Sequence, residues 1–127
     1  MKLLYLGPLR EHIFDFLRSM GDEVMHCEGA VDDARVEQAG FIVSYGYKHI
    51  LSPEITSRFS GKAINLHISL LPWNRGADPN LWSFLEDTPK GVTIHYIDPG
   101  IDTGDILAAR VVAPAIDDTL RTSYLRL

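Results

Sequence analysis

The sequence predicts an α/β protein of the Rossmann-like, doubly wound type, with a mostly parallel sheet and a C-terminal β-hairpin. Two observations predict this class. Over residues 1–67, short apolar runs alternate with stretches of helical spacing, a rhythm typical of strands joined by helices in a parallel sheet. Beyond residue 90, two runs that alternate apolar and polar residues flank a turn-rich segment, which predicts an antiparallel hairpin.

The first half of the chain is expected to contain four strands and three helices. Apolar runs of strand length predict the strands at residues 2–6, 23–27, 41–44 and 62–67. The intervening helices are predicted at residues 9–20, 31–38 and 53–59. The third helix has a typical start, with Ser52 as N-cap and Pro53 in the first turn. Residues at helical spacing predict the apolar face of the first helix as Leu9, Ile13, Phe16, Leu17 and Met20.

The second half begins with an irregular segment, residues 68–80, that holds prolines, asparagine and glycine without a regular period. Loops of this length in a compact domain are usually functional, and Leu70, Leu71 and Trp73 indicate that this one is ordered. The other expected elements are a short helix, two hairpin strands and a last helix, at residues 80–86, 91–97, 105–112 and 117–127. We expect a single domain over residues 1–127 that is truncated at its C-terminal end.

Composition excludes several classes of protein. The chain has 127 residues, of which 46% are hydrophobic, enough apolar content for a folded domain rather than a disordered segment. Cys27 is the single cysteine, so no disulfide can form within the chain. No apolar run approaches the about 18 residues of a membrane span, and the apolar start is too short for a secretory signal. These features predict a cytoplasmic protein that does not bind a membrane.

The charge balance argues against nucleic acid as a partner. The chain carries 12 Lys plus Arg against 17 Asp plus Glu, a formal net charge of −5. Binding to a phosphate backbone grows with the number of cations that a protein presents. We therefore expect a small-molecule partner. A single arginine is enough to bind the phosphate of a small phosphorylated ligand.

Three polar side chains near predicted strand ends are candidates for catalysis: Asn65, His67 and Asp102. Asn65 and His67 lie two residues apart on a predicted strand, so they point to the same face. An amide and a protonated imidazole that converge in this way can stabilise an oxyanion. A carboxylate such as Asp102 can favour the protonated imidazole and orient its ring. Spacing alone leaves open an alternative in which Asn65 holds a loop backbone and His67 is a core histidine.

Several motifs follow one another in unbroken order between residues 41 and 112. They are Ile50-Leu51-Ser52-Pro53, the run GKAINLHISLLP at residues 61–72, Arg75-Gly76, Gly91-Val92-Thr93-Ile94-His95 and Asp102-Thr103-Gly104-Asp105-Ile106. In this order they resemble the 10-formyltetrahydrofolate-dependent formyltransferases, a family that includes glycinamide ribonucleotide, methionyl-tRNA and sugar-amine formyltransferases. The first 40 residues resemble that family only in their alternation of strands and helices.

The resemblance implies that Asn65, His67 and Asp102 form the catalytic trio of a formyltransferase domain, with 10-formyltetrahydrofolate as co-substrate and no metal ion. An amine would attack the formyl carbon, and Asn65 and protonated His67 would stabilise the resulting oxyanion. Asp102 would keep His67 charged and help to move the proton of the amine. His95, which also fits the family pattern, is expected to have a supporting role.

For the folate, the resemblance implies the loop after the third strand and the loop before Asp102. The candidate folate-binding residues are Tyr45, Gly46, Tyr47, His49, Leu51, Asp98 and Gly100. Two alternatives stay open: the tyrosines pack the edge of the sheet, and His49 faces solvent.

The acceptor is predicted by elimination to be the amino group of a nucleotide-linked amino sugar. Glycinamide ribonucleotide enzymes carry a glycine-rich phosphate loop after the first strand, whereas Gly7 is the single glycine there. Methionyl-tRNA enzymes carry a further C-terminal domain that grips tRNA, and an acidic chain is a poor replacement for it. Trp73 and Arg75 are expected to bind the acceptor by stacking and by pairing with a diphosphate. The alternative is that Trp73 anchors the loop to the core while Arg75 is solvated.

Other functions remain open at this point. The acceptor can be methionyl-tRNA or another amine, or water in a formyltetrahydrofolate hydrolase. The chain can also be a non-catalytic folate-binding module. A homodimer is compatible with the sequence.

Overall fold

The computed structural model describes residues 1–127 as two compact units, Met1–Asn65 and Leu66–Leu127. The strands follow the order β2-β1-β3-β4-β5-β6 in the hydrogen-bonded sheet. Pairing is parallel among the first three strands and antiparallel in the terminal hairpin, so the predicted fold class is confirmed. None of the helices combines the length and the apolar character that a membrane span requires. The assignment of residues 1–127 to one truncated domain stays a prediction.

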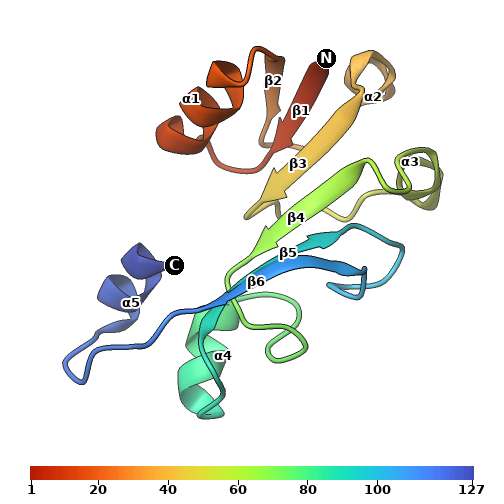
Figure 1. The fold of residues 1–127 in the computed structure, drawn as a ribbon. Coiled ribbons are helices and arrows are strands. Elements are labelled where there is room, and N and C mark those ends of the chain that lie inside the picture. Colours follow the sequence, from red (N-terminus) through yellow and green to blue (C-terminus); the bar gives the residue numbers. More distant parts are fainter. The chain divides into compact units, whose positions relative to one another are not determined.

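The first unit is organised around β1 (Lys2–Leu6), whose residues Leu4, Tyr5 and Leu6 are fully buried. It pairs in parallel with β2 (Glu23–Cys27) on one side and with β3 (Phe41–Tyr45) on the other. The strand that follows β1 in the chain therefore lies on one side of it, and the next strand lies on the other side. Because crossovers between parallel strands are right-handed, the first helix lies on one face of these strands and the next two lie on the opposite face (Figure 1).

Local sequence signals explain where the helices of this unit begin. The second helix, α2 (Asp33–Gln38), starts after Asp32, whose carboxylate accepts a hydrogen bond from Arg35 N at 2.8 Å. The third helix, α3 (Pro53–Arg58), has Ser52 as its N-cap and Pro53 in its first turn, as predicted. It leads into β4 (Ala63–His67), which begins beside β3 because Ile42 N donates to Lys62 O.

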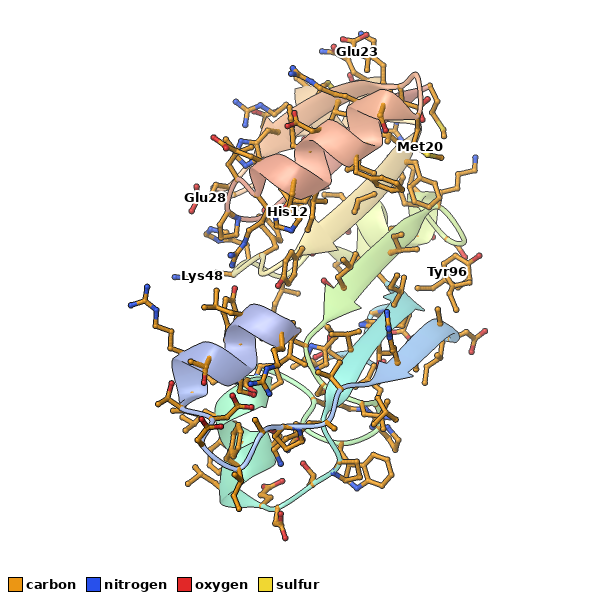
Figure 2. All side chains as sticks on the ribbon, turned by 60° about the vertical axis from the view of Figure 1, so that its left-hand side comes forward. His12, Met20, Glu23, Glu28, Lys48 and Tyr96 are labelled. Atoms are coloured by element: carbon orange, nitrogen blue, oxygen red, sulfur yellow. The ribbon has the colours of Figure 1, made fainter.

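The predicted apolar face of the first helix is partly wrong. This helix, α1 (Glu11–Ser19), begins two residues later than predicted, and Leu9 precedes it in an exposed position. Phe16 is 62% exposed and Met20, labelled in Figure 2, is 66% exposed. The half-buried aromatic residue is instead Phe14, whose ring packs edge-on against Tyr5 at 6.4 Å between centroids. Because α1 lies against the edge strand β2, its inward face is narrow and accepts only part of the apolar residues at helical spacing.

The second unit contains the predicted hairpin. Strand β5 (Gly91–Tyr96) pairs antiparallel with β6 (Ile106–Val111). In β5 the alternate residues Gly91, Thr93 and His95 are buried, and a register shift in the pairing lies between Ile94 and His95. Such irregularities re-aim a side chain within a strand and are common beside active sites.

The loop after β4 is ordered, as predicted. The hydroxyl of Thr93 accepts a hydrogen bond from Leu71 N at 3.0 Å and donates to Ser69 O at 2.8 Å, which ties the loop to β5. The predicted short helix is α4 (Pro79–Leu85). The last helix, α5 (Leu120–Arg126), begins after Thr119, whose side chain caps it.

Candidate active site

The second unit places one carboxylate between two histidines. Asp102 Oδ2 lies 3.5 Å from His67 Nδ1, and Asp102 Oδ1 lies 3.3 Å from His95 Nε2. The three side chains are 12%, 7% and 3% exposed, respectively. Gly76 N also donates a hydrogen bond to Asp102 Oδ2 at 2.8 Å. The carboxylate is therefore held by groups from three different segments.

Each member of this cluster is fixed by its own element. His67 is the last residue of β4, and its Nε2–H donates to Asn74 O at 2.8 Å. His95 lies near the end of β5, and its Nδ1–H donates to Tyr96 O at 2.7 Å. Asp102 has a left-handed backbone conformation, with φ of 51°, which is uncommon outside glycine and is often found at functional sites.

The hydrogen-bond partners determine where the protons lie. Carbonyl oxygens only accept, so the ring nitrogens that face Asn74 O and Tyr96 O carry protons. The other nitrogen of each ring faces an oxygen of Asp102. With Asp102 ionised, every nitrogen of both rings therefore faces an acceptor, and for His95 this arrangement favours the protonated ring.

The environment shifts two pKa values in this cluster. Burial lowers the pKa of His95, but hydrogen bonds with Asp102 and with Tyr96 O, and the charges of Asp102 and Asp98, outweigh it, so this pKa lies above 6.5. Burial raises the pKa of Asp102, but the His95 and Gly76 hydrogen bonds and the two histidine charges outweigh it, so this pKa lies below 3.8. Charge pairing therefore prevails over desolvation at both groups.

These shifts predict how folding stability depends on pH. The lowered pKa of Asp102 stabilises the fold above pH 3.8, and this stabilisation is lost as the pH falls through the folded-state pKa. The raised pKa of His95 stabilises the fold below pH 6.5, and this is lost as the pH rises through the folded-state pKa. Urea unfolding is therefore expected to show the largest contribution of the cluster between these two pH values. In Asp102→Asn the free energy of unfolding should depend less on pH, at both the acid and the alkaline end, than in the exposed control Asp87→Asn. The same pH dependence in the two variants would contradict the assignment of these pKa shifts to the cluster.

The remaining catalytic candidate, Asn65, lies in β4 two residues before His67 and is half-buried. The backbone alternation of a strand places the two side chains on one face, as the sequence predicts. Its proposed role in stabilising an oxyanion stays a prediction.

The folate candidates of the first unit follow β3. Tyr45 ends the strand, and the Arg10 guanidinium lies 5.2 Å from the centre of its ring. The Tyr47 hydroxyl donates to Gly29 O at 2.9 Å and accepts from Val31 N at 3.1 Å. Burial raises the pKa of Tyr47 above 10.0, with a smaller opposing contribution from the Val31 hydrogen bond. This hydroxyl therefore helps to hold the loop after β2.

The remainder of that loop contains an exposed apolar side chain. Gly46 has a positive φ of 67°, and His49 is exposed with its ring 5.3 Å from that of Tyr47. Ile50 is 86% exposed, whereas Leu51 is buried. The roles of these residues in binding folate stay predictions.

The folate candidates of the second unit shape the turn before Asp102. Asp98 Oδ1 accepts hydrogen bonds from Gly100 N at 2.9 Å and from Thr103 Oγ1 at 2.6 Å. A side chain on Gly100 would collide with Thr103. Ile101 is 61% exposed between them. Asp98 and Gly100 thus fix the backbone that presents Asp102, and this turn leaves an apolar side chain available to a ligand.

The two acceptor candidates lie in the loop after β4. The backbone of Trp73 is held at both ends, because its N–H donates to Leu70 O and its carbonyl accepts from Ser69 Oγ. The Trp73 and Arg75 side chains are exposed. The backbone thus anchors the loop while both side chains remain accessible, which leaves their predicted roles open to test.

The histidines, cysteines and carboxylates do not form a group of three or more that could hold a metal ion. The carboxylate of Asp102 instead lies between two imidazole rings. The arrangement is suited to transferring a proton and stabilising an oxyanion.

Residues 19–127 match the formyl transferase family. This chain belongs to that family. The solved formyltransferase PseJ from Anoxybacillus kamchatkensis, in complex with UDP-4,6-dideoxy-4-formamido-L-AltNAc and tetrahydrofolate, is 57% identical to it, with a TM-score of 0.95. That match covers 99% of this chain and 68% of the PseJ chain. The family resemblance predicted from the sequence motifs is thus confirmed.

Curated relatives in the formyl transferase family are longer than this chain. The phosphoribosylglycinamide formyltransferase of Bacillus subtilis is 32% identical over 101 residues, which are 79% of this chain and 52% of that protein. The methionyl-tRNA formyltransferase of Desulfotalea psychrophila is 40% identical over 87 residues, which are 68% of this chain and 27% of that protein. This chain therefore spans about half the length of these relatives or less.

In this formyl transferase family member, sequence reasoning did not identify the partner of His95. The signal was present, because the alternation of β5 predicts that His95 points inward with Thr93, and a buried histidine requires hydrogen-bond partners. Its contact with Asp102 depends on the turn at residues 98–102, which periodicity does not describe. The roles of Asn74 O and Gly76 N were also missed, because backbone groups have no sequence signal.

Proposed function

We propose that this chain transfers a formyl group from 10-formyltetrahydrofolate to the amino group of a nucleotide-linked amino sugar. The observation that carries this proposal is Asp102 held between His67 and His95. The identity with PseJ supports the sugar acceptor and the folate co-substrate. We further propose that the partner is a small molecule rather than nucleic acid, and that the protein is cytoplasmic. A homodimer stays a prediction.

Each of the two predicted folate-binding segments, taken by itself, has residues that suit part of a folate. Each of the two candidate segments has an exposed apolar side chain, Ile50 in one and Ile101 in the other. Tyr45 supplies an aromatic ring, and residues 99–101 of the turn are exposed. A flat ring system with polar edges requires such a combination of apolar and aromatic surfaces with a few polar groups. When bound, 10-formyltetrahydrofolate supplies the formyl carbon.

The geometry indicates which proton of His67 is available to the formyl oxygen. Nε2–H is held by Asn74 O at 2.8 Å, whereas Nδ1 lies 3.5 Å from Asp102 Oδ2. The distance of 3.5 Å between His67 Nδ1 and Asp102 Oδ2 exceeds that of a good hydrogen bond. Hydrogen bonds to a substrate often become short only when the substrate binds. We propose that His67 Nδ1–H and the Asn65 amide donate to the oxygen as negative charge develops on it.

Asp102 is the proposed acceptor for the proton of the attacking amine. The attack forms a bond from nitrogen to the formyl carbon, and the amine must then lose one proton. His95 and Gly76 lower the pKa of Asp102, so the carboxylate is ionised and able to take that proton at neutral pH. The bond between the formyl carbon and the folate nitrogen then breaks, and the proton passes to that nitrogen, which restores the carboxylate.

An acceptor panel tests the proposed function. The chain is mixed with 10-formyltetrahydrofolate and, separately, a UDP-linked 4-amino sugar, glycinamide ribonucleotide, methionyl-tRNA or no amine, and the absorbance of the folate product is followed. We expect turnover with the amino sugar alone. Turnover without an amine would indicate a hydrolase, and folate binding without turnover would indicate a binding module. Preference for either of the other two acceptors would overturn the sugar assignment.

A further inference from the structure

A cavity of about 390 Å³ opens between the first turns of α4 and α5 in the second unit. Its volume falls in the range of small-molecule sites. Apolar side chains form much of its wall, and an aspartate, an arginine and a tyrosine add polar groups. The residues that matter to the argument are Ile68, Asp78, Leu81, Leu120, Arg121 and Tyr124.

The cavity is held in shape by a buried amide. Asn80 Nδ2 donates to Leu120 O at 3.1 Å, and Asn80 Oδ1 accepts from Ser123 Oγ at 3.1 Å. Asn80 and Ser123 are 7% and 5% exposed. Because both ends of the amide are used, the start of α4 is fixed against the start of α5. The site is therefore formed before a ligand arrives, which reduces the entropy lost on binding.

Asp78 has a backbone conformation that its position in the helix does not require. It is the N-cap of α4 with φ of 51° and ψ of 46°, and its carboxylate makes no capping hydrogen bond. An N-cap aspartate normally has extended backbone and caps the helix. Asp87 has the same φ of 51°, but it follows the C-cap of α4, where a left-handed residue is common. Asp78 therefore lines the cavity with a carboxylate that does not cap the helix.

Two residues of the cavity wall lie close in sequence to residues of the candidate active site. Ile68, in its wall, is joined by a peptide bond to His67. Asp78 is two residues from Gly76, whose N–H donates to Asp102. The cavity wall is therefore one residue along the chain from His67 and two residues from the glycine that holds Asp102.

We propose that this cavity holds the body of the acceptor, a phosphorylated amino sugar, during formyl transfer. Hydroxyl groups of the sugar ring donate to the Asp78 carboxylate, which only accepts hydrogen bonds. Arg121 pairs with a phosphate oxygen, and the apolar wall packs against the ring. The proposal rests on the proposed function and identifies the residues that select its acceptor.

Two substitutions and two matched controls test this site. Asp78→Asn is compared with Asp87→Asn, an aspartate of the same φ at the other end of α4. Arg121→Gln is compared with Arg110→Gln, an exposed arginine on β6. The acceptor KM is measured with the UDP-linked 4-amino sugar, and binding of UDP alone is measured by calorimetry.

We expect Arg121→Gln to weaken UDP binding and to raise the acceptor KM about tenfold to a hundredfold, in keeping with lost hydrogen bonds to charged groups. Asp78→Asn should raise the acceptor KM by a similar factor and leave UDP binding unchanged, because UDP lacks the amino sugar. The folate KM should stay constant in all four variants. Acceptor KM values equal to those of the controls would overturn the proposal.

Failure of the proposed function gives a different result. In that case the unmodified chain would transfer no formyl group to any amine. UDP binding that is lost in Arg121→Gln and kept in Arg110→Gln would still support the cavity as a nucleotide site. If the unmodified chain transfers formyl groups but does not bind UDP, the occupant proposed here is wrong while the enzyme assignment stands.

Discussion

Replacing His67 with glutamine is expected to reduce kcat for formyl transfer about 10²- to 10⁴-fold, the usual effect of losing a positioned acid–base group. Glutamine is polar and similar in size, but it cannot be protonated. The ring that His67 now places between Asn74 O and Asp102 would be replaced by a neutral amide. The oxyanion would then lose a charged donor, while binding of both substrates should change little.

The matched control for this substitution is His12→Gln. His12 is an exposed histidine on α1, labelled in Figure 2, and its loss should leave kcat unchanged. Steady-state rates at saturating folate and acceptor measure both variants, and urea unfolding confirms that both remain folded. A His67→Gln variant that retains kcat within a few-fold of the control would remove His67 from the mechanism.

The part of the candidate site that the sequence predicts is the part that follows from strand alternation. Asn65 and His67 are two residues apart on a strand, so their shared face follows from backbone geometry. The same alternation turns His95 inward with Thr93. Their shared relation to Asp102 required the structure, because it depends on a left-handed residue in a turn and on the N–H of Gly76.

The sequence did not predict two other features, the packed face of α1 and the cavity between α4 and α5. Apolar residues at helical spacing predicted α1, but spacing does not reveal that only a narrow face of that helix packs, so Phe16 was placed inside instead of Phe14. The cavity between α4 and α5 depends on Asn80 reaching Leu120 and Ser123. A pairing between residues so distant in sequence leaves no local pattern.

Substitution of Asp102 by asparagine is expected to lower kcat about 10²- to 10⁴-fold, because an amide cannot take a proton from the amine.

His95 is a positioning residue, because it acts through the carboxylate of Asp102. His95→Gln removes the strongest of the contributions that oppose burial and keep the pKa of Asp102 low. That pKa should therefore rise, and the acid limb of the kcat/KM profile should move to higher pH. A role of His95 in folding alone would lower the rate equally at every pH.

A double-mutant cycle separates these roles most sharply. If His95 acts only by holding Asp102 ionised and in place, then His95→Gln should have almost no effect on kcat in a chain that already carries Asp102→Asn. Residues that act through one group give such non-additive effects, whereas independent residues give effects that multiply. Rates for the two single variants and the double variant, with His12→Gln as the background control, decide between these outcomes. Fully multiplicative losses would show that His95 contributes by a route that does not pass through the carboxylate.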